Sequence, residues 1–467
     1  MSVPYWVQDS VFYQIFPDRF ANGNPDLDPV NVHAWGSPPT LWHFQGGDFQ
    51  GIMDRFDYLL DLGINAIYFN PVFYSTSNHR YNTCDYYRID PILGDMNDFK
   101  RLLNLAHYHN VRVILDGVFN HCGRGFFAFN DLLENQEYSQ YRDWFHVRHF
   151  PIDAYSPGQA QDYLAWWGIK SLPKFNTNHP PVRKYLLDIA RYWIETGIDG
   201  WRLDVPNEID DDSFWAEFRH TVKSINPEAY IVGEIWTVDP RWVGPAHFDG
   251  LLNYPLRDAV IRFIHSETLN AEQFLKKCSD LCSVYPSENV PAMYLTLGSH
   301  DTERVLTKME GSVAKVKLAF ASIFSLPGAP GIYYGDEIGL PGGKDPDCRR
   351  AFPWDNSIWN HELRDWVKQL ISSRKQYPEI RSGSFSPLYF ENEKKCLAFW
   401  RELADEKVAV IINASAEQQT LKIPMTFNPP PMEMRNILGN ENYPIINGEI
   451  IISLPSWGCV WLKQTRP

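Results

Sequence analysis

The feature that most restricts the fold of this sequence is an alternation of short apolar runs with amphipathic stretches between residues 11 and 334. In one unit a helical stripe follows Asn97 or Asp98, either of which can cap a helix, and the apolar run 111–115 then ends at Asp116. A second stripe between residues 182 and 193 breaks at Gly197 and leads into a run that ends at Asp204. This alternation predicts repeated strand–helix units around a parallel sheet.

Eight apolar runs are strand candidates, at residues 11–16, 66–69, 111–115, 200–204, 230–235, 250–254, 293–297 and 331–334. Eight strands with helices between them fit a closed (β/α)8 TIM barrel, an α/β fold, better than an open doubly wound sheet. An open sheet usually carries a glycine-rich phosphate turn near its start, and this sequence has none there.

Two regions depart from the barrel pattern. Residues 122–181 are rich in aromatics, lack a steady period and are too long for a simple loop, so we expect an inserted subdomain B over the barrel mouth. After residue 382, period-two runs at 396–401, 408–413 and 450–454 predict a C-terminal antiparallel β domain. The predicted organisation is a catalytic barrel of residues 1–121 and 182–381, a subdomain of residues 122–181 and a β domain of residues 382–467.

Composition and charge exclude several classes of partner. The formal charge of −14 at pH 7 argues against nucleic acid, whose binding proteins concentrate Lys and Arg on one face. No segment reaches about 18 apolar residues and the N-terminus lacks a leader pattern, so we expect a cytoplasmic protein without a membrane partner. Seven cysteines without metal-type pairs predict reduced thiols, although Cys278 and Cys282 would share a helical face, where a disulfide or half a metal site stays open.

Four carboxylates stand at or just after predicted strand ends, where barrel enzymes place their chemistry. Asp116, Asp204 and Glu234 close the third, fourth and fifth strands, and Asp301 follows the seventh. A single carboxylate there would more often be a helix cap or part of a turn. Four in the same position predict an active site at the barrel mouth.

The spacing of Arg202 and Asp204 suggests a nucleophile. Residues two apart on a strand project to the same side, so the cation would lie beside Asp204 and hold it ionised, as a nucleophile requires. The alternative is that Arg202 only neutralises Asp116.

Glu234 is the candidate for a general acid/base. It lies one strand–helix unit beyond Asp204, and Trp236 beside it would exclude water, so Glu234 would keep its proton longer. Asp301 and His300 would contact the substrate, although His300 could also be a packed core histidine.

Four runs together resemble the α-amylase family, glycoside hydrolase family 13: DGVFNH at 116–121, GWRLDVPNE at 200–208, GEIW at 233–236 and GSHDTER at 298–304. Their order and spacing also match, nearly from end to end of the chain. A fifth run, LPKFN at 172–176, together with the pair Asn207–Glu208, is similar to the subfamily of neopullulanases, cyclomaltodextrinases and maltogenic amylases.

The resemblance implies Asp204 as nucleophile, Glu234 as acid/base and Asp301 as transition-state stabiliser. It also implies a set of substrate-binding residues: His79, Tyr81, Asp116, His121, Arg202, Asn207, Glu208, Trp236, His300, Asp345, Arg349 and Trp354. Within this set, His79 and Tyr81 resemble a stacking platform, and Asn207 and Glu208 resemble residues of the acceptor side. From spacing alone, Asp345 and Arg349 could equally be a surface ion pair.

Near the N-terminus the runs FANGNPDLDP and GGDF cluster oxygen ligands of the kind that calcium needs. This region resembles a calcium site of the family, with ligands at Asn22, Asn24, Asp28, the Gly46 carbonyl and Asp48. The alternative is a turn-rich loop whose Asn and Asp side chains bond their own backbone. One departure is Leu27, which stands where relatives often offer a further ligand.

Two more departures bear on assembly and on the site. Relatives in the subfamily usually carry an extra β domain before the barrel, which helps to build a dimer, whereas this sequence starts directly at VFYQIFPDRF. A homodimer and the size limit of the substrate therefore stay open. Pro206 stands where relatives more often have a small residue, so the loop after Asp204 is expected to be stiffer.

The sequence thus predicts a retaining α-glycoside hydrolase acting on α-glucans such as maltooligosaccharides, pullulan, cyclodextrins or branched oligosaccharides, with some transglycosylation. The competing enzyme class is an exo-acting α-glucosidase or a sucrose-active relative, which usually lacks the LPKFN run. The competing non-enzyme class is an amylase-like binding protein, which would be expected to lose one of Asp204, Glu234 and Asp301.

Overall fold

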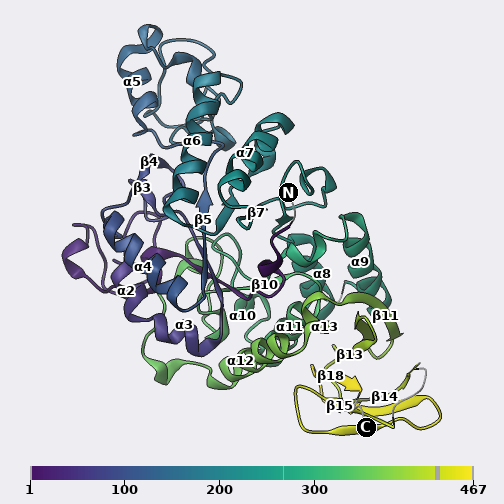
Figure 1. Ribbon diagram of the computed structural model, residues 1–467. Helices are drawn as coiled ribbons and strands as arrows, with labels where there is room; N and C mark the ends of the chain where they lie inside the picture. The colour runs from purple at the N-terminus through teal and green to yellow at the C-terminus, as the bar shows by residue number, and fades with distance from the viewer. Residues whose placement is uncertain (1–2, 267, 426, 428–431, 465–467) are drawn as a thin grey trace.

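The computed structural model describes residues 3–266, 268–425, 427 and 432–464, and it contains the predicted barrel (Figure 1). Eight parallel strands form one sheet in the order β8-β7-β6-β5-β2-β1-β10-β9. An isolated parallel bridge between Leu252 and Tyr294 joins the two ends of this order, next to β8 and in β9, so the sheet closes on itself. The strands are β1 (Phe12–Ile15), β2 (Ala66–Phe69), β5 (Arg112–Gly117), β6 (Gly200–Leu203), β7 (Tyr230–Gly233), β8 (Gly250–Leu251), β9 (Tyr294–Thr296) and β10 (Ala329–Tyr333).

The barrel strands are buried on both faces because helices cover the outside and side chains fill the inside. Inward-facing aromatic rings fill the interior. The ring centroid of Phe12 lies 5.3 Å from that of Tyr294 and 5.8 Å from that of Tyr230, and the centroids of Tyr68 and Tyr294 are 6.2 Å apart. Alternate residues on the same strands, such as Tyr13, belong to the larger core between sheet and helices. The barrel is therefore a packed support for the residues at its mouth.

The helices largely follow the predicted stripes, with one correction. The helix expected after Asn97 or Asp98 begins earlier, because Asp95 caps α4 and forms a reciprocal capping box with Asp98. Gly197 ends α6 in the left-handed region, as predicted. The helices are α1 (Pro17–Phe20), α2 (Phe49–Asp54), α3 (Phe56–Leu62), α4 (Met96–Tyr108), α5 (Phe127–Asn135), α6 (Pro180–Thr196), α7 (Asp212–Ile225), α8 (Tyr254–Ile264), α9 (Ala271–Val284), α10 (Val305–Lys308), α11 (Val313–Ser325), α12 (His361–Gln376) and α13 (Pro378–Ser382).

The sixth predicted strand, residues 250–254, is shorter than expected. Only Gly250–Leu251 form β8, and Asn253 caps α8, which begins at Tyr254. The apolar run therefore continues from a strand directly into a helix, and periodicity cannot separate the two within five residues. The other seven predicted strands differ from the observed ones by at most two residues at either end.

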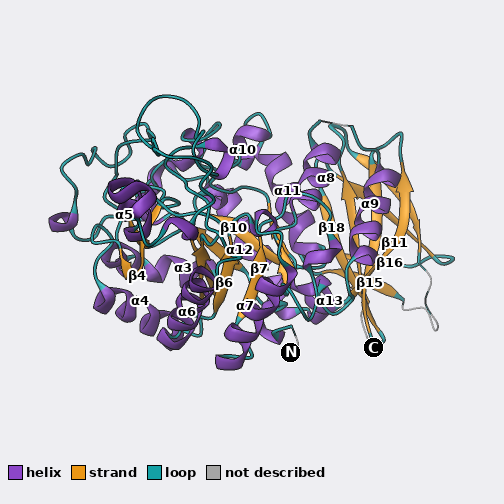
Figure 2. Ribbon diagram, turned by 90° about the horizontal axis from the view of Figure 1, so that it is seen from above, coloured by secondary structure: helices purple, strands orange, loops and turns teal. Residues whose placement is uncertain are grey.

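Between β5 and α6 the chain forms α5, short 3-10 turns and a set of isolated bridges instead of a sheet. A hairpin of β3 (Phe73–Ser75) and β4 (Thr83–Ile89) lies against this region through the hydrogen bond from Gly123 N to Thr83 O. The region around α5 and the C-terminal strands lie at opposite ends of the molecule (Figures 1 and 2). The boundaries predicted for the three domains remain predictions.

The C-terminal part is antiparallel, as expected. Six strands form a sheet in the order β11-β12-β13-β18-β15-β16, and β14 pairs with β17 in a second sheet. Their alternating inward residues form a separate hydrophobic cluster. The strands are β11 (Ser384–Glu391), β12 (Cys396–Leu403), β13 (Glu406–Asn413), β14 (Gln419–Pro424), β15 (Glu433–Asn436), β16 (Asn442–Pro444), β17 (Glu449–Leu454) and β18 (Cys459–Gln464).

All seven cysteines are free thiols, as predicted, so Cys278 and Cys282 form no disulfide.

Among the described helices, none is both long enough and apolar enough to cross a membrane.

Candidate active site

Arg202 is the centre of the carboxylate cluster at the barrel mouth. Its Nη1 lies 2.7 Å from Asp116 Oδ1 and 3.0 Å from Asp204 Oδ1, and its Nη2 lies 2.8 Å from Glu234 Oε1. The guanidinium is buried at the end of β6, next to β5 and β7. Arg202 therefore does more than neutralise Asp116, because one cation holds three carboxylates from three neighbouring strands.

Asp116 is fully engaged by neighbouring groups. Its Oδ2 accepts hydrogen bonds of 2.7 Å from the hydroxyls of both Tyr68 and Tyr81, while its Oδ1 faces Arg202. An acceptor with three strong donors has little capacity left for a substrate. Asp116 therefore positions Arg202 and Tyr81.

His300 connects Tyr81 with Asp301. Its Nδ1 lies 3.0 Å from the side-chain amide nitrogens of both Gln14 and Asn70, so Nδ1 is an acceptor and the proton of this tautomer sits on Nε2. Nε2 in turn lies 2.6 Å from the Tyr81 hydroxyl oxygen and 2.9 Å from Asp301 Oδ2. The ring of His300 is thus fixed for donation toward Asp301.

Asp301 lies between two basic groups, His300 and Arg349. Arg349 Nη2 is 3.4 Å from Asp301 Oδ1, and Arg349 Nη1 is 3.1 Å from Asp345 Oδ1. Burial would raise the pKa of Asp301, but His300 and Arg349 outweigh that effect and lower it, so Asp301 is ionised. Arg349 is buried and also donates from Nε to the His300 carbonyl, so its pair with Asp345, whose side chain is 39% exposed, links the buried cluster to the surface.

Asp204 and Glu234 share one environment. Burial raises the pKa of both carboxyl groups, and Arg202 opposes the rise without cancelling it. The expectation that Arg202 keeps Asp204 ionised is therefore too simple: the two buried carboxyls interact on one cation, so their protons are lost in steps that belong to the pair. Val205, between them in the chain, has a φ of 36° and donates from its backbone N to Glu234 Oε2 at 3.3 Å.

Two histidines border the cluster as neutral rings. Burial lowers the pKa of His79 to about 3 and that of His121 to about 3. His79 lies 6.0 Å from Tyr81 between ring centroids with the planes 24° apart, consistent with the stacking platform inferred from the resemblance. His121 Nε2 is buried and has no hydrogen-bond partner within the protein, so it can bond a substrate hydroxyl.

The remaining predicted residues differ in position. Trp236 is 47% exposed and stacks on Tyr254 with 3.7 Å between centroids, which places an open ring face two residues beyond Glu234. Asn207 and Glu208 lie exposed in the turn after Asp204. Trp354 packs instead against Phe20, Tyr58, Phe352 and Trp359 and donates to the Phe20 carbonyl.

The candidate calcium loop is partly assembled. Asn22 Nδ2 donates to Asp28 Oδ1 at 2.8 Å, the two side chains surround Gly46, and Asn22 Oδ1 is buried without a partner. Asp48 accepts backbone N–H bonds from Gly23, Asn24 and Gly51, so it caps α2. Burial raises the pKa of both Asp28 and Asp48. Among the described residues no three His, Cys, Asp or Glu side chains gather as metal ligands, so a cation here would depend on amide and carbonyl oxygens.

Sequence reasoning missed three polar groups of the site, Gln14, Asn70 and Tyr68. Gln14 interrupts an apolar strand, Asn70 directly follows β2, and both amides hold His300. A buried polar residue at the end of a barrel strand is the same signal that identified the four carboxylates. Applied to amides and hydroxyls, it would have found these residues as well.

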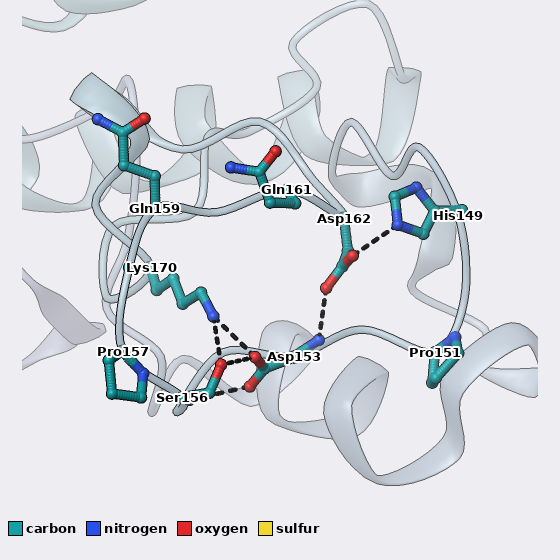
Figure 3. A pocket seen from close by; sticks show the side chains of 10 residues that line it. His149, Pro151, Asp153, Ser156, Pro157, Gln159, Gln161, Asp162 and Lys170 are labelled. Carbon is teal, nitrogen blue, oxygen red and sulfur yellow. Dashed lines mark hydrogen bonds and ion pairs between the residues drawn. The ribbon is translucent and has the colours of Figure 1, made fainter.

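A separate hollow of about 530 Å³ is lined by residues 149–170, in the segment between β5 and α6 (Figure 3). Its rim is polar, and its charged groups are paired with one another. Asp162 Oδ1 lies 2.6 Å from His149 Nε2, and Lys170 Nζ lies 2.7 Å from Asp153 Oδ2. The hollow holds none of the predicted site residues.

A closed (β/α)8 barrel with a buried Arg–carboxylate cluster at its mouth defines a barrel glycosidase. Residues 14–405 match the family described as alpha amylase, catalytic domain, and residues 385–461 match maltogenic amylase, C-terminal domain. The chain therefore belongs to the α-amylase family, glycoside hydrolase family 13, and is a glycosidase of that family.

Relatives of known sequence agree with this assignment. A cyclomaltodextrinase of Geobacillus thermopakistaniensis is 46% identical over 459 residues, which are 98% of this chain and 77% of the relative. Neopullulanase 2 of Thermoactinomyces vulgaris is 42% identical over 422 residues, covering 90% of this chain and 72% of that protein.

Solved structures show the same fold over the whole chain. The cyclic α-maltosyl-(1→6)-maltose hydrolase of Arthrobacter globiformis superposes with a TM-score of 0.91 at 39% identity, covering 99% of this chain and all of that one. The debranching enzyme of Nostoc punctiforme superposes with a TM-score of 0.90 at 40% identity and the same coverage.

Proposed function

We propose that this α-glucan hydrolase works by double displacement, with Asp204 as nucleophile and Glu234 as general acid/base. The observation that supports this most strongly is the contact of both carboxyls with terminal nitrogens of one guanidinium, that of Arg202. The two carboxyls lie at the ends of the neighbouring strands β6 and β7 and share one cation, so they are close together. A retaining enzyme needs its two carboxyl groups about 5–5.5 Å apart, whereas an inverting enzyme needs a wider separation that leaves room for a water molecule.

In the first step an Asp204 oxygen forms a bond to the anomeric carbon while the glycosidic C–O bond breaks. The proton shared by the pair passes from Glu234 to the leaving oxygen, and a β-linked glycosyl-enzyme results. In the second step Glu234, now ionised, takes a proton from water, and the water oxygen displaces Asp204 from the anomeric carbon. The product has the α configuration, and Glu234 again carries its proton.

Asp301 acts differently from the other two acids. His300 and Arg349 keep it ionised, so it stabilises the positive charge that develops on the sugar ring in the transition state. The unpartnered Nε2 of His121 presents a ring nitrogen for a sugar hydroxyl, whereas His300 holds Asp301 and Tyr81 in place. His79 and Tyr81 offer ring surface to the same sugar.

The substrates we propose are maltooligosaccharides and related cyclic or branched α-glucans. The names of the relatives support this choice, since they include a cyclomaltodextrinase, a neopullulanase and a debranching enzyme. Asn207 and Glu208, exposed beyond the nucleophile, would line the acceptor side, where a sugar hydroxyl can replace water and give transglycosylation.

We further propose a cytoplasmic location and a structural calcium ion. An intracellular maltogenic amylase of Bacillus subtilis, 40% identical over 410 residues, supports the location. The unpartnered Asn22 oxygen, the half-buried carboxylate of Asp28 and the buried carboxylate of Asp48 suit a hard cation, with the Gly46 carbonyl and Asn24 as further ligands. Calcium would neutralise these carboxylates and hold the loop in place. A homodimer remains a prediction.

The catalytic roles are tested with Asp204→Asn and Glu234→Gln. Each should lower kcat on maltohexaose by several orders of magnitude while leaving the melting temperature and circular dichroism spectrum close to those of the wild type. The matched control is Asp210→Asn, an exposed carboxylate that pairs with Arg241 outside the cluster. Near-normal turnover in either site variant would remove its assignment.

A further inference from the structure

Three aromatic rings form a continuous stack from the active site to solvent. His121 stacks on Trp166 with 5.4 Å between ring centroids and an angle of 21° between the ring planes. Trp166 stacks on Trp167 with 4.5 Å between centroids and an angle of 10° between planes. His121 is buried, whereas Trp167 is 75% exposed. One face of the Trp167 indole is covered by Trp166, and the exposure of the ring leaves the other open.

Packing within the protein does not account for Trp167. Its backbone has φ 51° and ψ 22°, a left-handed conformation that is unfavourable for a bulky residue. The turn is held in this form because Trp166 N donates to Leu172 O and Ala165 bridges Pro173. A strained, mostly exposed indole that contributes little to the core suggests a role in binding.

The turn that carries Trp167 is tied to the acceptor side of the proposed nucleophile. Lys174, just beyond the turn, bridges His121 through the backbone and donates from Nζ to the Glu208 carbonyl at 2.6 Å. Glu208 belongs to the turn that follows Asp204. The same short hairpin thus contacts the site histidine on one side and the 206–208 turn on the other.

Polar groups lie next to the exposed ring. Trp166 Nε1 is buried without a partner, as is His121 Nε2 in the same stack. Gly168, which follows Trp167, packs against the side chain of Gln159, and Gln159 lines the polar hollow of Figure 3. An open aromatic face beside a hollow with a polar rim is the arrangement that binds a pyranose ring, whose faces are apolar and whose edge carries hydroxyls.

We propose that Trp167 is a platform for a glucose residue of the α-glucan beyond the acceptor site, so that it sets the preference for longer chains. The proposal rests on the function proposed above and deepens it. The indole would stack on a residue that short substrates do not possess. It therefore contributes to the binding of long oligosaccharides and long acceptors and leaves the chemistry at Asp204 unchanged.

The test compares Trp167→Gly with Trp167→Phe. Glycine removes the ring and relieves the left-handed strain, whereas phenylalanine keeps a ring in the same conformation. For Trp167→Gly we expect KM for maltoheptaose to rise about tenfold. The value of kcat/KM for an aryl α-glucoside should stay within about twofold of the wild type. The melting temperature should not fall, because glycine relieves the backbone strain. Trp167→Phe should keep KM for maltoheptaose within about threefold of the wild type.

A binding measurement separates this proposal from the proposed function. Calorimetric titration of maltoheptaose into Glu234→Gln protein, with and without Trp167→Gly, needs no turnover, and we expect Kd to weaken about tenfold when the ring is removed. An unchanged Kd would overturn the platform role, as would equal losses on the long and the aryl substrate or a lowered melting temperature. If the wild type hydrolyses neither substrate, the proposed function fails, and the calorimetric comparison still decides on Trp167.

Discussion

Replacing Arg202 with methionine should destabilise the barrel in a pH-dependent way. The side chain is buried and lies within 3.0 Å of carboxylate oxygens of Asp116, Asp204 and Glu234. Methionine keeps much of the volume and removes the charge, which leaves three buried carboxyls without a cation. Breaking a buried pair by removing one partner costs about 3–5 kcal/mol, so we expect a loss of that size in the free energy of unfolding near neutral pH.

The direction of the pH dependence follows from the raised pKa values of Asp204 and Glu234. Without Arg202 these values rise further, because the effect that opposed burial is gone. As pH increases from the ordinary carboxyl pKa toward the raised folded values, the unfolded chain releases protons that the folded protein retains, so stability falls. The deficit of the variant should therefore be smaller at pH 5 than at pH 7.5.

The assay is urea unfolding followed by tryptophan fluorescence at both pH values, for the wild type and Arg202→Met. The control is Arg101→Met, which removes an exposed ion pair with Asp98 and should change the free energy of unfolding by less than about 1 kcal/mol. A deficit for Arg202→Met no larger than that of the control, or one that grows as pH falls, would refute the electrostatic argument.

Two other predictions concern the proposed calcium and the general acid. Treatment with a chelator should lower the melting temperature of the wild type, because an ion that binds only the native state stabilises it by mass action. The same treatment should leave the melting temperature of Asp28→Asn almost unaffected. An unchanged wild-type melting curve with no metal in elemental analysis would count against the site. Since burial raises the pKa of Glu234, kcat/KM should fall as pH rises through that pKa, and this alkaline limb should be absent from the residual activity of Glu234→Gln. An identical limb in the variant would assign the general acid to another group.

Much of the fold could be predicted because its signals are local. Three of the barrel strands are apolar runs followed directly by a polar residue, Asn70 after β2, Asp204 after β6 and Glu234 after β7, and Gly197 ends α6 as its conformational freedom suggests. The errors occurred where local signals compete. Asp95, and not Asn97 or Asp98, caps α4: all three residues can accept backbone N–H bonds, and the reciprocal capping box of Asp95 with Asp98 sets the first turn. The two-residue strand β8 runs into α8 without any change in hydrophobicity.

The site was predictable in its charged residues and less so in their environment. Strand-end position and motif order identified Asp204, Glu234 and Asp301. The sequence could not show that burial raises the pKa of Asp204 as well as that of Glu234, because desolvation depends on the whole cleft. It also could not show that Trp354 packs into the core and that Trp167 remains open to solvent, since both are simply tryptophans in irregular segments.

The most direct test of the central claim, double displacement at Asp204, is proton NMR of the first product. Maltohexaose is mixed with enzyme in the spectrometer, and the anomeric signals of the newly released reducing end are followed before mutarotation. Two successive displacements at one carbon restore its configuration, so the α-anomer should appear first and the β-anomer should grow at the rate of mutarotation. Initial appearance of the β-anomer would contradict the mechanism and the role of Asp204 as nucleophile.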